Sequence, residues 1–544
     1  TQTSMGDYIG VWTKAQQGTA KGAKANATKD NSLSWIWDNI VNYTWKKSVH
    51  SITATGVFSA QKYQYDRLYG ASKDLSFNSL WYNLNGGAIE SLSSNFSQWT
   101  MMSYVGRINY GLMDRYLLTA SLRYDGSSRL SEGNKWALFP SAAIAWRITE
   151  EDFAKNLDWL SNLKLRFSYG QAGNTNSVSP YASEGTISGS VYYPFGTSTS
   201  VGNLPANIAN PMLTWERTSE YNVGLDFGFL NQRISGNIEY YNRTTNDLLM
   251  KRNIPVHLGY SSVTSNVGSV RNSGFELQLN TANIMTKNFA WNTTINLAYN
   301  KNEIVSLADE EDLSNYSIHL QGMRGRYSDK RFIGKPVDTN WTQNTIGVWQ
   351  LGEEEEAAKY GCVPGNFKIK DYNNDGKLTD DDYIIDGKRT PDWTGGMTNM
   401  FKIYDFDFSF HMYFQAGATQ YDRFFENFAL EWNSQNFNNL RTNYWTPENP
   451  SNTMGRPSQM GSRGNIAYER TDFLKVSYIT LGYTLNKRLM SKWGLDNARI
   501  YVTVQNPFIL TKFRGLDPEQ PDLTNIGDTD GMTMNALLGV NISF

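Results

Sequence analysis

The sequence is poor in the residues that build disulfides, metal centres and membrane helices. It has a single cysteine, Cys362, which excludes an internal disulfide and a zinc site made of several cysteine ligands. The mean hydropathy is −0.51, and no apolar run approaches the roughly 18 residues that a membrane helix needs, so a helical membrane protein is excluded. A net charge of −2 argues against nucleic acid as a partner, because nucleic-acid-binding surfaces are basic.

Arrangements typical of catalysis are also missing from the sequence. Its four histidines, His50, His257, His319 and His411, are far apart and have neither metal-ligand spacing nor a nucleophile motif beside them. No glycine-rich loop with a following Lys-Ser or Lys-Thr pair is present to hold a phosphate. The sequence therefore predicts a protein that is not an enzyme and has no organic cofactor.

Aromatic residues are abundant, and in many places they alternate with polar ones. Charged residues make up only 19% of the chain, whereas aromatic residues reach 14%, with 17 Trp and 32 Tyr. In the stretch 404–415, aromatic residues and one methionine take the even positions, and ionisable or polar residues take nearly all the odd ones. A strand of roughly 10 residues with one apolar and one polar face is typical of a membrane-spanning β-barrel, whose outside meets lipid and whose inside meets water.

The same alternation recurs along the whole chain, and recurrence matters because each barrel strand gives a weak signal. We count roughly 16 or 17 candidate strands, for example 163–169, 221–229 and 234–240, joined alternately by tight turns and long polar stretches. Long segments without strands are predicted near 64–98, 172–212, 303–392, 417–470 and 511–534. The predicted fold is an all-β, antiparallel transmembrane barrel with long extracellular loops. Its last strand is predicted to end at Phe544, after Leu538, Val540 and Ile542.

Seven segments carry a resemblance to a known family, and they occur in order from about residue 100 to the end. They resemble the SusC/RagA-like TonB-dependent outer-membrane transporters, although Lys475 and Ser477 stand where the family pattern has Arg and Asn. The segments are NPMLTWERT (210–218), YNVGLDFGF (221–229), GNIEYYNRTTNDLL (236–249), NVGSVRNSGFE (266–276), YWTPENP (444–450), FLKVSYITLGY (473–483) and GLDPE (515–519).

The resemblance implies a 22-stranded barrel that follows a plug domain and a carboxypeptidase-like N-terminal domain. We find neither domain in the sequence, and residues 1–544 are predicted to be the C-terminal part of such a barrel. The chain begins Thr1-Gln2-Thr3 without an initiator Met or a signal peptide, which predicts a processed or incomplete N terminus. A partial barrel is not expected to close alone, because every backbone donor in the bilayer must be satisfied.

The function implied by the resemblance is TonB-dependent import of oligomeric nutrients, glycans or peptides, across the outer membrane of a Gram-negative bacterium. The implied partners are a SusD-like surface lipoprotein, the TonB complex acting through the missing N-terminal region, outer-membrane lipid and the transported substrate. Charges on the inner faces are expected to line the lumen or to hold the plug; examples are Arg107, Arg123, Lys164 and Asp226. Two alternatives remain open, a passive channel or adhesin barrel and a soluble all-β glycan-binding protein.

One segment has the pattern of a calcium loop. Asp371, Asn373 and Asp375 take positions 1, 3 and 5 of such a loop, and Gly376 takes the sharp turn at position 6. The carbonyl of Lys377, the side chain of Thr379 and the carboxylate of Asp382 would complete the ligand set, with Asp in place of the usual Glu at position 12. The sequence predicts a calcium site at 371–382, and the alternative is an Asx-rich turn without a metal.

Loop aromatics form a further candidate surface. They could stack on sugar rings or peptide side chains at the mouth of the barrel, or they could pack the loops themselves. The residues in question are Trp81, Tyr82, Tyr192, Tyr193, Trp341 and Trp349.

Overall fold

The structure is a computed structural model. It describes residues 2–9, 23–75, 83–255, 257, 259–307, 314–315, 324–326, 330–426, 429, 442–457, 462–486, 490, 492–521 and 532–544. Helices are few and short, for example α1 (Glu354–Lys359) and α2 (Arg423–Phe425). In the described residues, no helix has the length and apolar character needed to cross a membrane.

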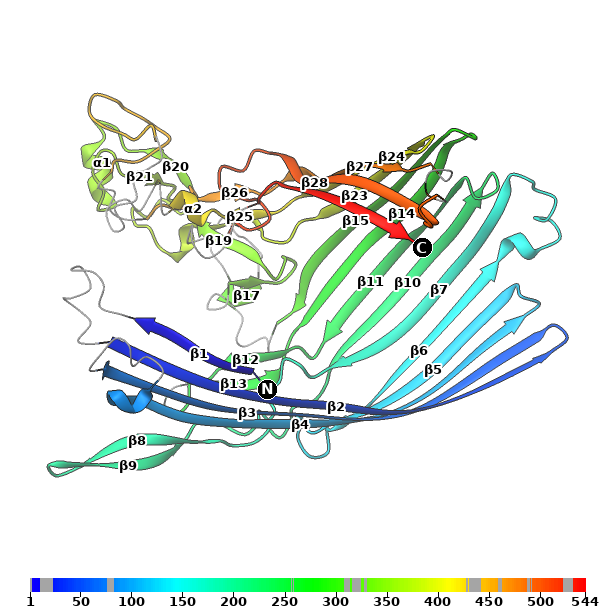
Figure 1. The fold of residues 1–544 in the computed structure, drawn as a ribbon. Coiled ribbons are helices and arrows are strands. Elements are labelled where there is room, and N and C mark those ends of the chain that lie inside the picture. Colours follow the sequence, from blue (N-terminus) through cyan, green and yellow to red (C-terminus); the bar gives the residue numbers. More distant parts are fainter. Residues whose placement is uncertain are drawn as a thin grey trace.

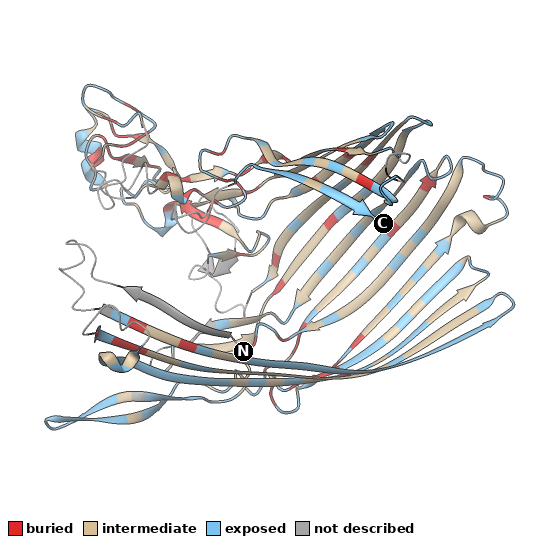
Figure 2. Cartoon of the chain, in the orientation of Figure 1, coloured by how far each residue is buried: buried red, intermediate tan, exposed pale blue. Residues whose placement is uncertain are grey.

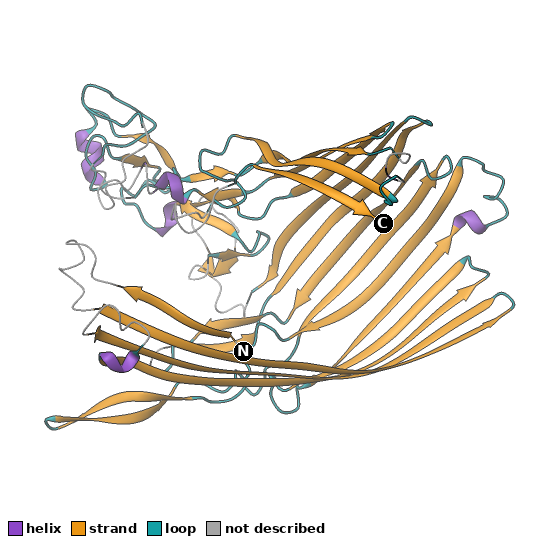
Figure 3. Ribbon diagram, in the orientation of Figure 1, coloured by secondary structure: helices purple, strands orange, loops and turns teal. Residues whose placement is uncertain are grey.

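One antiparallel sheet of 16 strands dominates the fold, and each strand pairs with the next in chain order once the short loop strands are left aside. The sheet curls as Figure 1 shows, and Figure 3 shows how little helix accompanies it. The sixteen strands agree with the number predicted from alternation. They are β1 (Gln2–Ile9), β2 (Ala23–Lys47), β3 (His50–Leu75), β4 (Ala88–Leu112), β5 (Tyr116–Ser127), β6 (Trp136–Arg147), β7 (Leu160–Asn174), β10 (Glu216–Phe229), β11 (Ile234–Asn246), β14 (Ser269–Met285), β15 (Phe289–Ser306), β23 (Trp393–Ile403), β24 (Phe406–Ala416), β27 (Phe473–Thr484), β28 (Asn497–Thr511) and β29 (Asn535–Ser543).

The sheet has two different ends. At the end on the right of Figure 1, strands are joined by short connections such as residues 48–49 and 230–233. In the second of these, Leu230, Asn231 and Gln232 all have positive φ, which lets two strands reverse tightly. At the other end lie the long connections, including 307–392 and 417–472. This division of short turns and long loops is characteristic of outer-membrane barrels.

The register of the strands separates an apolar face from a polar one. Residues directly opposite each other in neighbouring strands point to the same face of a sheet, so a row of partners can be followed across it. One such row is Phe167, Val223, Tyr240, Phe275, Tyr299 and Trp393. The row one residue away is Arg166, Gly224, Glu239, Glu276, Ala298, Thr394 and Gln415.

Aromatic pairs on the apolar face form two belts. Near the long loops, Tyr169 and Tyr221 have ring centroids 4.8 Å apart, and Tyr299 and Trp393 are 4.7 Å apart. Near the short turns, the rings of Trp291 and Phe401 are 5.6 Å apart. Trp291 and Tyr299 are eight residues apart on β15, which is roughly 27 Å along a strand and about 20 Å across the membrane at a tilt of about 40°. This is close to the apolar height that a barrel presents to lipid.

Among the described residues, the buried apolar clusters lie in the long connections and at the strand ends next to them. Figure 2 shows exposed positions along the barrel strands and buried ones within the loop clusters. Val348, Phe367, Phe425 and Trp445 belong to one such cluster, which holds together connections far apart in the sequence. Exposed apolar side chains on the barrel strands, such as Phe275 at 55%, are those that lipid would cover.

The prediction of a loop at 64–98 was wrong for most of its length. β3 and β4 continue to pair as far as Lys73 and Ala88. Apolar residues are sparse here, and Leu68, Leu92 and Phe96 pair with Ser94, Gly70 and Asp66 and not with one another, so alternation does not reveal these strands. It is held by the backbone ladder and by polar contacts, including the hydroxyl of Tyr65 donating to Asp30 at 2.7 Å.

The prediction that 404–415 is one unbroken strand also needs a small correction, because Tyr404 has a φ of +53° and belongs to the turn before β24.

Short strands organise the long loops. The loop strands form the pairs β8 (Ile187–Phe195) with β9 (Ser198–Pro205), β12 (Leu249–Asn253) with β13 (Ser262–Asn266), β19 (Thr339–Gln343) with β22 (Tyr383–Lys388), β20 (Thr345–Val348) with β21 (Phe367–Ile369) and β25 (Thr419–Tyr421) with β26 (Tyr468–Arg470), and the triplet β16 (Ser314–Asn315), β17 (Arg324–Arg326) and β18 (Arg331–Phe332).

Candidate functional site

A network of charges lies on the polar face of the sheet. The carboxylate of Asp226 accepts from the ammonium of Lys164 at 2.7 Å and from the guanidinium of Arg166 at 2.8 Å. Arg166 also donates to Glu239 at 2.7 Å. These residues come from β7, β10 and β11, so the network ties three neighbouring strands on one face. Lys164 and Asp226, predicted from sequence to share the inner face, are thus brought together, and each neutralises part of the other's charge.

A cavity of about 540 Å³ opens on the same face, further along the sheet. Glu239, Glu276 and His411 are among the residues that line it. His411 lies on the polar side of β24, as the alternation predicts, and its Nδ1 is 2.9 Å from the hydroxyl of Thr398. The cavity is lined by side chains able to bind a polar solute or to contact a domain seated within the barrel.

The two remaining predicted inner charges, Arg107 and Arg123, lie on the polar face. Arg107 is exposed and pairs in register with Ser121. Arg123 donates to Asp125 at 2.6 Å and to Ser103 at 3.0 Å. Next to Arg123, however, β6 contributes Phe139, which is buried against Trp215. The face therefore becomes partly apolar towards the long loops, which alternation alone does not reveal.

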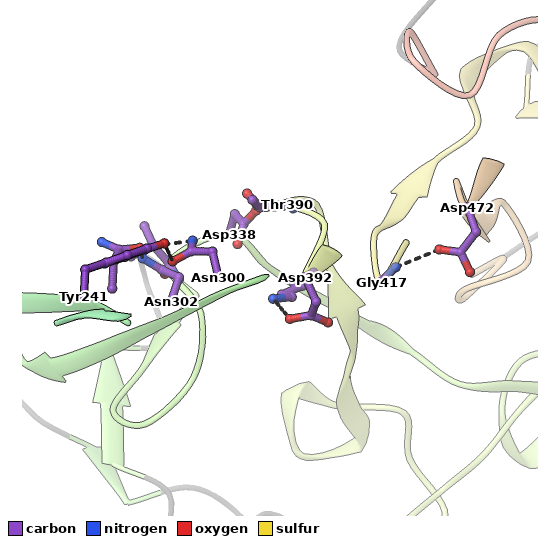
Figure 4. Close-up of polar contacts among 11 residues, drawn as sticks. Tyr241, Asn300, Asn302, Asp338, Thr390, Asp392, Gly417 and Asp472 are labelled. Carbon is purple, nitrogen blue, oxygen red and sulfur yellow. Dashed lines mark hydrogen bonds and ion pairs between the residues drawn. The ribbon is translucent and has the colours of Figure 1, made fainter. Parts of the chain in front are cut away.

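Several polar contacts lie where the barrel strands end and the long connections begin (Figure 4). There the hydroxyl of Tyr241 donates to Asn300 at 3.0 Å. The carboxylate of Asp338 accepts from the backbone N–H of Thr390 at 2.6 Å. The backbone N–H of Gly417 donates to Asp472 at 2.7 Å. The first bond joins β11 to β15, and the other two each join two parts of one long connection, within 307–392 and within 417–472. Sequence reasoning missed them because their partners are between 52 and 59 residues apart.

Some of the predicted loop aromatics pack the loops themselves, and others are exposed. Trp341 and Trp349 are buried, with Trp341 packed on Phe332 at a centroid distance of 4.7 Å. Tyr192 and Tyr193 lie on β8 and are exposed. The two other predicted loop aromatics, Trp81 and Tyr82, lie outside the described residues.

The predicted calcium loop is closed by its own backbone. Asp371 accepts from the N–H groups of Asn374 at 2.6 Å and Gly376 at 2.9 Å, and Gly376 has a φ of +78°. Burial alone would raise the pKa of Asp371. These backbone hydrogen bonds and the hydroxyl of Tyr360 outweigh that effect, so the pKa of Asp371 lies below its ordinary value.

The later residues of the loop are joined in the same way. Asn373 accepts from the N–H of Asp375 at 3.1 Å, and Asp375 accepts from that of Lys377 at 2.8 Å. Asp382 is fully buried and accepts from the N–H groups of Tyr372 and Thr379, both at 2.8 Å. Across the part of the chain that is described, no three acidic, histidine or cysteine side chains gather as a metal site would require. Calcium at 371–382 therefore stays a prediction.

The fold and its two faces define a class: an all-β outer-membrane barrel of the kind that carries a polar lumen. The comparisons with known proteins make the assignment specific. Residues 4–394 match the family described as TonB dependent receptor-like, beta-barrel. The chain belongs to this family, which is located in the outer membrane of Gram-negative bacteria and consists of receptors and transporters rather than enzymes.

Curated relatives agree. The chain is 35% identical to TonB-dependent receptor SusC of Bacteroides thetaiotaomicron over 82% of its own length and 44% of that protein. It is 32% identical to TonB-dependent receptor P26 of Formosa agariphila over 96% of its own length and 54% of that protein. The chain thus spans about half the length of the curated relatives that it matches.

Solved structures show the same fold. The RagAB peptide importer in its open-open state matches with a TM-score of 0.78 and 24% identity, covering 96% of this chain and 55% of that one. A second structure of the RagAB peptide transporter matches with a TM-score of 0.75 over 91% of this chain and 54% of that one. At this identity the similarity concerns the fold alone.

Proposed function

We propose that the protein takes part in TonB-dependent import of oligomeric nutrients, glycans or peptides, across the outer membrane. The single observation that carries the proposal is the polar face that runs across β7, β10, β11 and β14 of a sheet whose other face is apolar and belted with aromatics, in a chain of the TonB-dependent receptor family. A water-lined interior of this kind passes polar solutes through lipid.

A SusD-like surface lipoprotein is proposed as the partner at the mouth, and the TonB complex as the source of energy. The relatives support both: one is SusC, and the RagAB structures join a transporter of this fold with a second component. The long connections, which make up the mouth, offer the surface for such a partner.

Residues 1–544 are proposed to be the C-terminal part of a longer barrel. Two observations support this: the chain spans about half of its relatives, and in the described residues β1 and β29 pair with β2 and β28 respectively but not with each other. The charges around Asp226 and Glu239 would then face a plug within the lumen.

The function is tested by the energy dependence of uptake. Cells that carry the intact transporter should take up its oligomeric substrate, and a protonophore should abolish uptake at an unchanged outer-membrane abundance of the protein. Uptake that survives the protonophore would favour a passive channel or adhesin barrel. Extraction of the protein into buffer without detergent would favour the soluble glycan-binding alternative.

We further propose calcium as a structural ligand of the 371–382 loop. The support is the chemistry of the donors: carboxylate and amide oxygens at alternate positions, followed by a glycine with positive φ, are what calcium loops use.

A further inference from the structure

A second cavity lies in the loop cluster, separate from the one on the barrel wall. It has a volume of about 510 Å³, within the range of roughly 300–1,000 Å³ that is usual for small-ligand sites. Its walls come from segments far apart in the sequence, with β19, β25, α2 and β26 among them. These elements gather at the long-loop end of the sheet in Figure 1, where a solute approaching the lumen from outside would first meet the protein.

The lining of this cavity is strongly cationic. Four basic side chains, Lys330, Arg331, Arg389 and Arg423, line it together with one acidic residue, Asp338. The lining thus has four basic groups and one acidic group, in a chain whose net charge is −2; Arg331 and Arg423 also have other interaction partners, whereas Lys330 and Arg389 are the two basic groups used below.

The one acidic residue of the lining is held by neutral donors. The carboxylate of Asp338 accepts from both the N–H of Thr390, at 2.6 Å, and its hydroxyl, at 2.5 Å, as the neighbouring pair in Figure 4 illustrates. Within the described part of the chain, no carboxylate forms an ion pair with Lys330 or Arg389. Both side chains are exposed.

Aromatic and amide side chains complete the lining. Tyr421 and Tyr468 meet edge to face at 5.0 Å, and the buried Trp341 is packed against Phe332. The hydroxyl of Tyr421 donates to Glu426, so the position of that ring is fixed. Tyr421 and Tyr468 are half-buried and line the cavity beside polar groups, a combination of the kind that binds a sugar ring. An extended peptide is more often held through its main chain on a strand edge, whereas this cavity presents side chains.

We propose that this cavity binds an anionic oligosaccharide, with carboxylate or sulfate groups placed against Lys330 and Arg389 and a sugar ring against Tyr421. This rests on the proposed import function and names the class of cargo. A guanidinium donates two parallel hydrogen bonds to an oxyanion, and the charge of the lining attracts anions to the mouth before contact.

The test is calorimetric binding with the intact protein purified in detergent from the outer membrane. The probes are tetragalacturonate, a chondroitin sulfate tetrasaccharide, neutral maltotetraose and tetraglutamate. Wild-type protein should bind at least one acidic tetrasaccharide at least tenfold more tightly than maltotetraose or tetraglutamate. Binding should weaken at least tenfold in the double variant Lys330→Gln/Arg389→Gln. It should be unchanged in the control Lys135→Gln/Lys359→Gln, which removes two exposed loop charges away from the cavity.

Several results would overturn the proposal. The first is that neither acidic tetrasaccharide binds. The second is that an acidic tetrasaccharide binds wild type and K330Q/R389Q equally well. The third is that the protein prefers tetraglutamate or maltotetraose. A preference of that kind would leave import standing with a different cargo. Conversely, tight acidic-glycan binding combined with protonophore-resistant uptake would refute the import function and leave the cavity's specificity intact.

Discussion

Leu165 lies near the middle of the apolar face, and replacing it with arginine should destabilise the protein in lipid. Its side chain is 43% exposed and opposes Leu225, which also belongs to the apolar face. Tyr169, in the belt near the loops, is four residues away, and β7 begins five residues away at Leu160. At about 3.3 Å per residue and a tilt of about 40°, Leu165 lies roughly 10 Å or more from either edge of the apolar band.

An arginine at the middle of such a band costs about 2–4 kcal/mol of folding free energy. This corresponds to a decrease of roughly 30-fold to several hundred-fold in the folding equilibrium constant. The neighbouring Arg166 incurs no such cost, because it points to the polar face and donates to Asp226 and Glu239.

The control is Ser168→Arg on the same strand. Ser168 lies on the polar face and lines a cavity of about 670 Å³, which leaves room for the longer side chain. Its replacement should change the unfolding free energy by less than about 1 kcal/mol, as is usual for lumen positions. The assay is guanidinium unfolding of the protein reconstituted in phosphatidylcholine vesicles, followed by tryptophan fluorescence. Equal losses in L165R and S168R, or no loss in L165R, would refute the assignment of faces.

Three further predictions follow from particular contacts. Burial raises the pKa of Asp422 to about 6 from an ordinary value of 3.8, so its stabilising contribution is complete below about pH 4 and is lost as the pH rises through 6. After correction for the intrinsic pH dependence of exchange, the protection of the amides around Phe425 should accordingly fall over that interval in wild type but not in Asp422→Asn, a difference of about 3 kcal/mol at most. Asp226→Asn should lower the unfolding free energy by about 1–2 kcal/mol, because Lys164 and Arg166 lose a charged acceptor that is only partly shielded from water; an unchanged guanidinium midpoint would contradict this. Calcium should raise the melting temperature of wild type but not of Asp371→Asn, and equal melting temperatures with calcium and with EGTA would favour the metal-free turn.

The sequence is enough to predict the barrel wherever a strand crosses lipid. Over residues 221–229 of β10 and 234–240 of β11, every second residue is apolar or aromatic, as expected where hydrocarbon touches it, so the alternating faces and the tight turn between the two strands can be predicted without a structure. The outer parts of β3 and β4 give no such signal. Their few apolar residues, Leu68, Leu92 and Phe96, lie opposite polar residues or glycine, and the backbone ladder and pairs such as Tyr65 with Asp30 hold the strands together.

The candidate binding surfaces were predictable only in part. Lys164 and Asp226 each alternate with apolar residues along their own strands, so their place on the polar inner face could be predicted from the sequence. The cationic cavity does not follow from any local pattern, because Lys330 and Arg423 come from connections more than 90 residues apart in the sequence. Only the folding of the long loops onto one another brings their charges to one place.

The most direct measurement is a spin-label scan of β11 in reconstituted vesicles. Single cysteines at positions 236–241, in a background of Cys362→Ser, would be labelled and their collision rates with oxygen and with a water-soluble nickel chelate compared. We predict a period of two, with oxygen dominating at 236, 238 and 240 and the chelate at 237, 239 and 241, the positions of Asn237, Glu239 and Tyr241. A uniform profile, or chelate access at Ile238 and Tyr240, would contradict a strand with lipid on one side and water on the other.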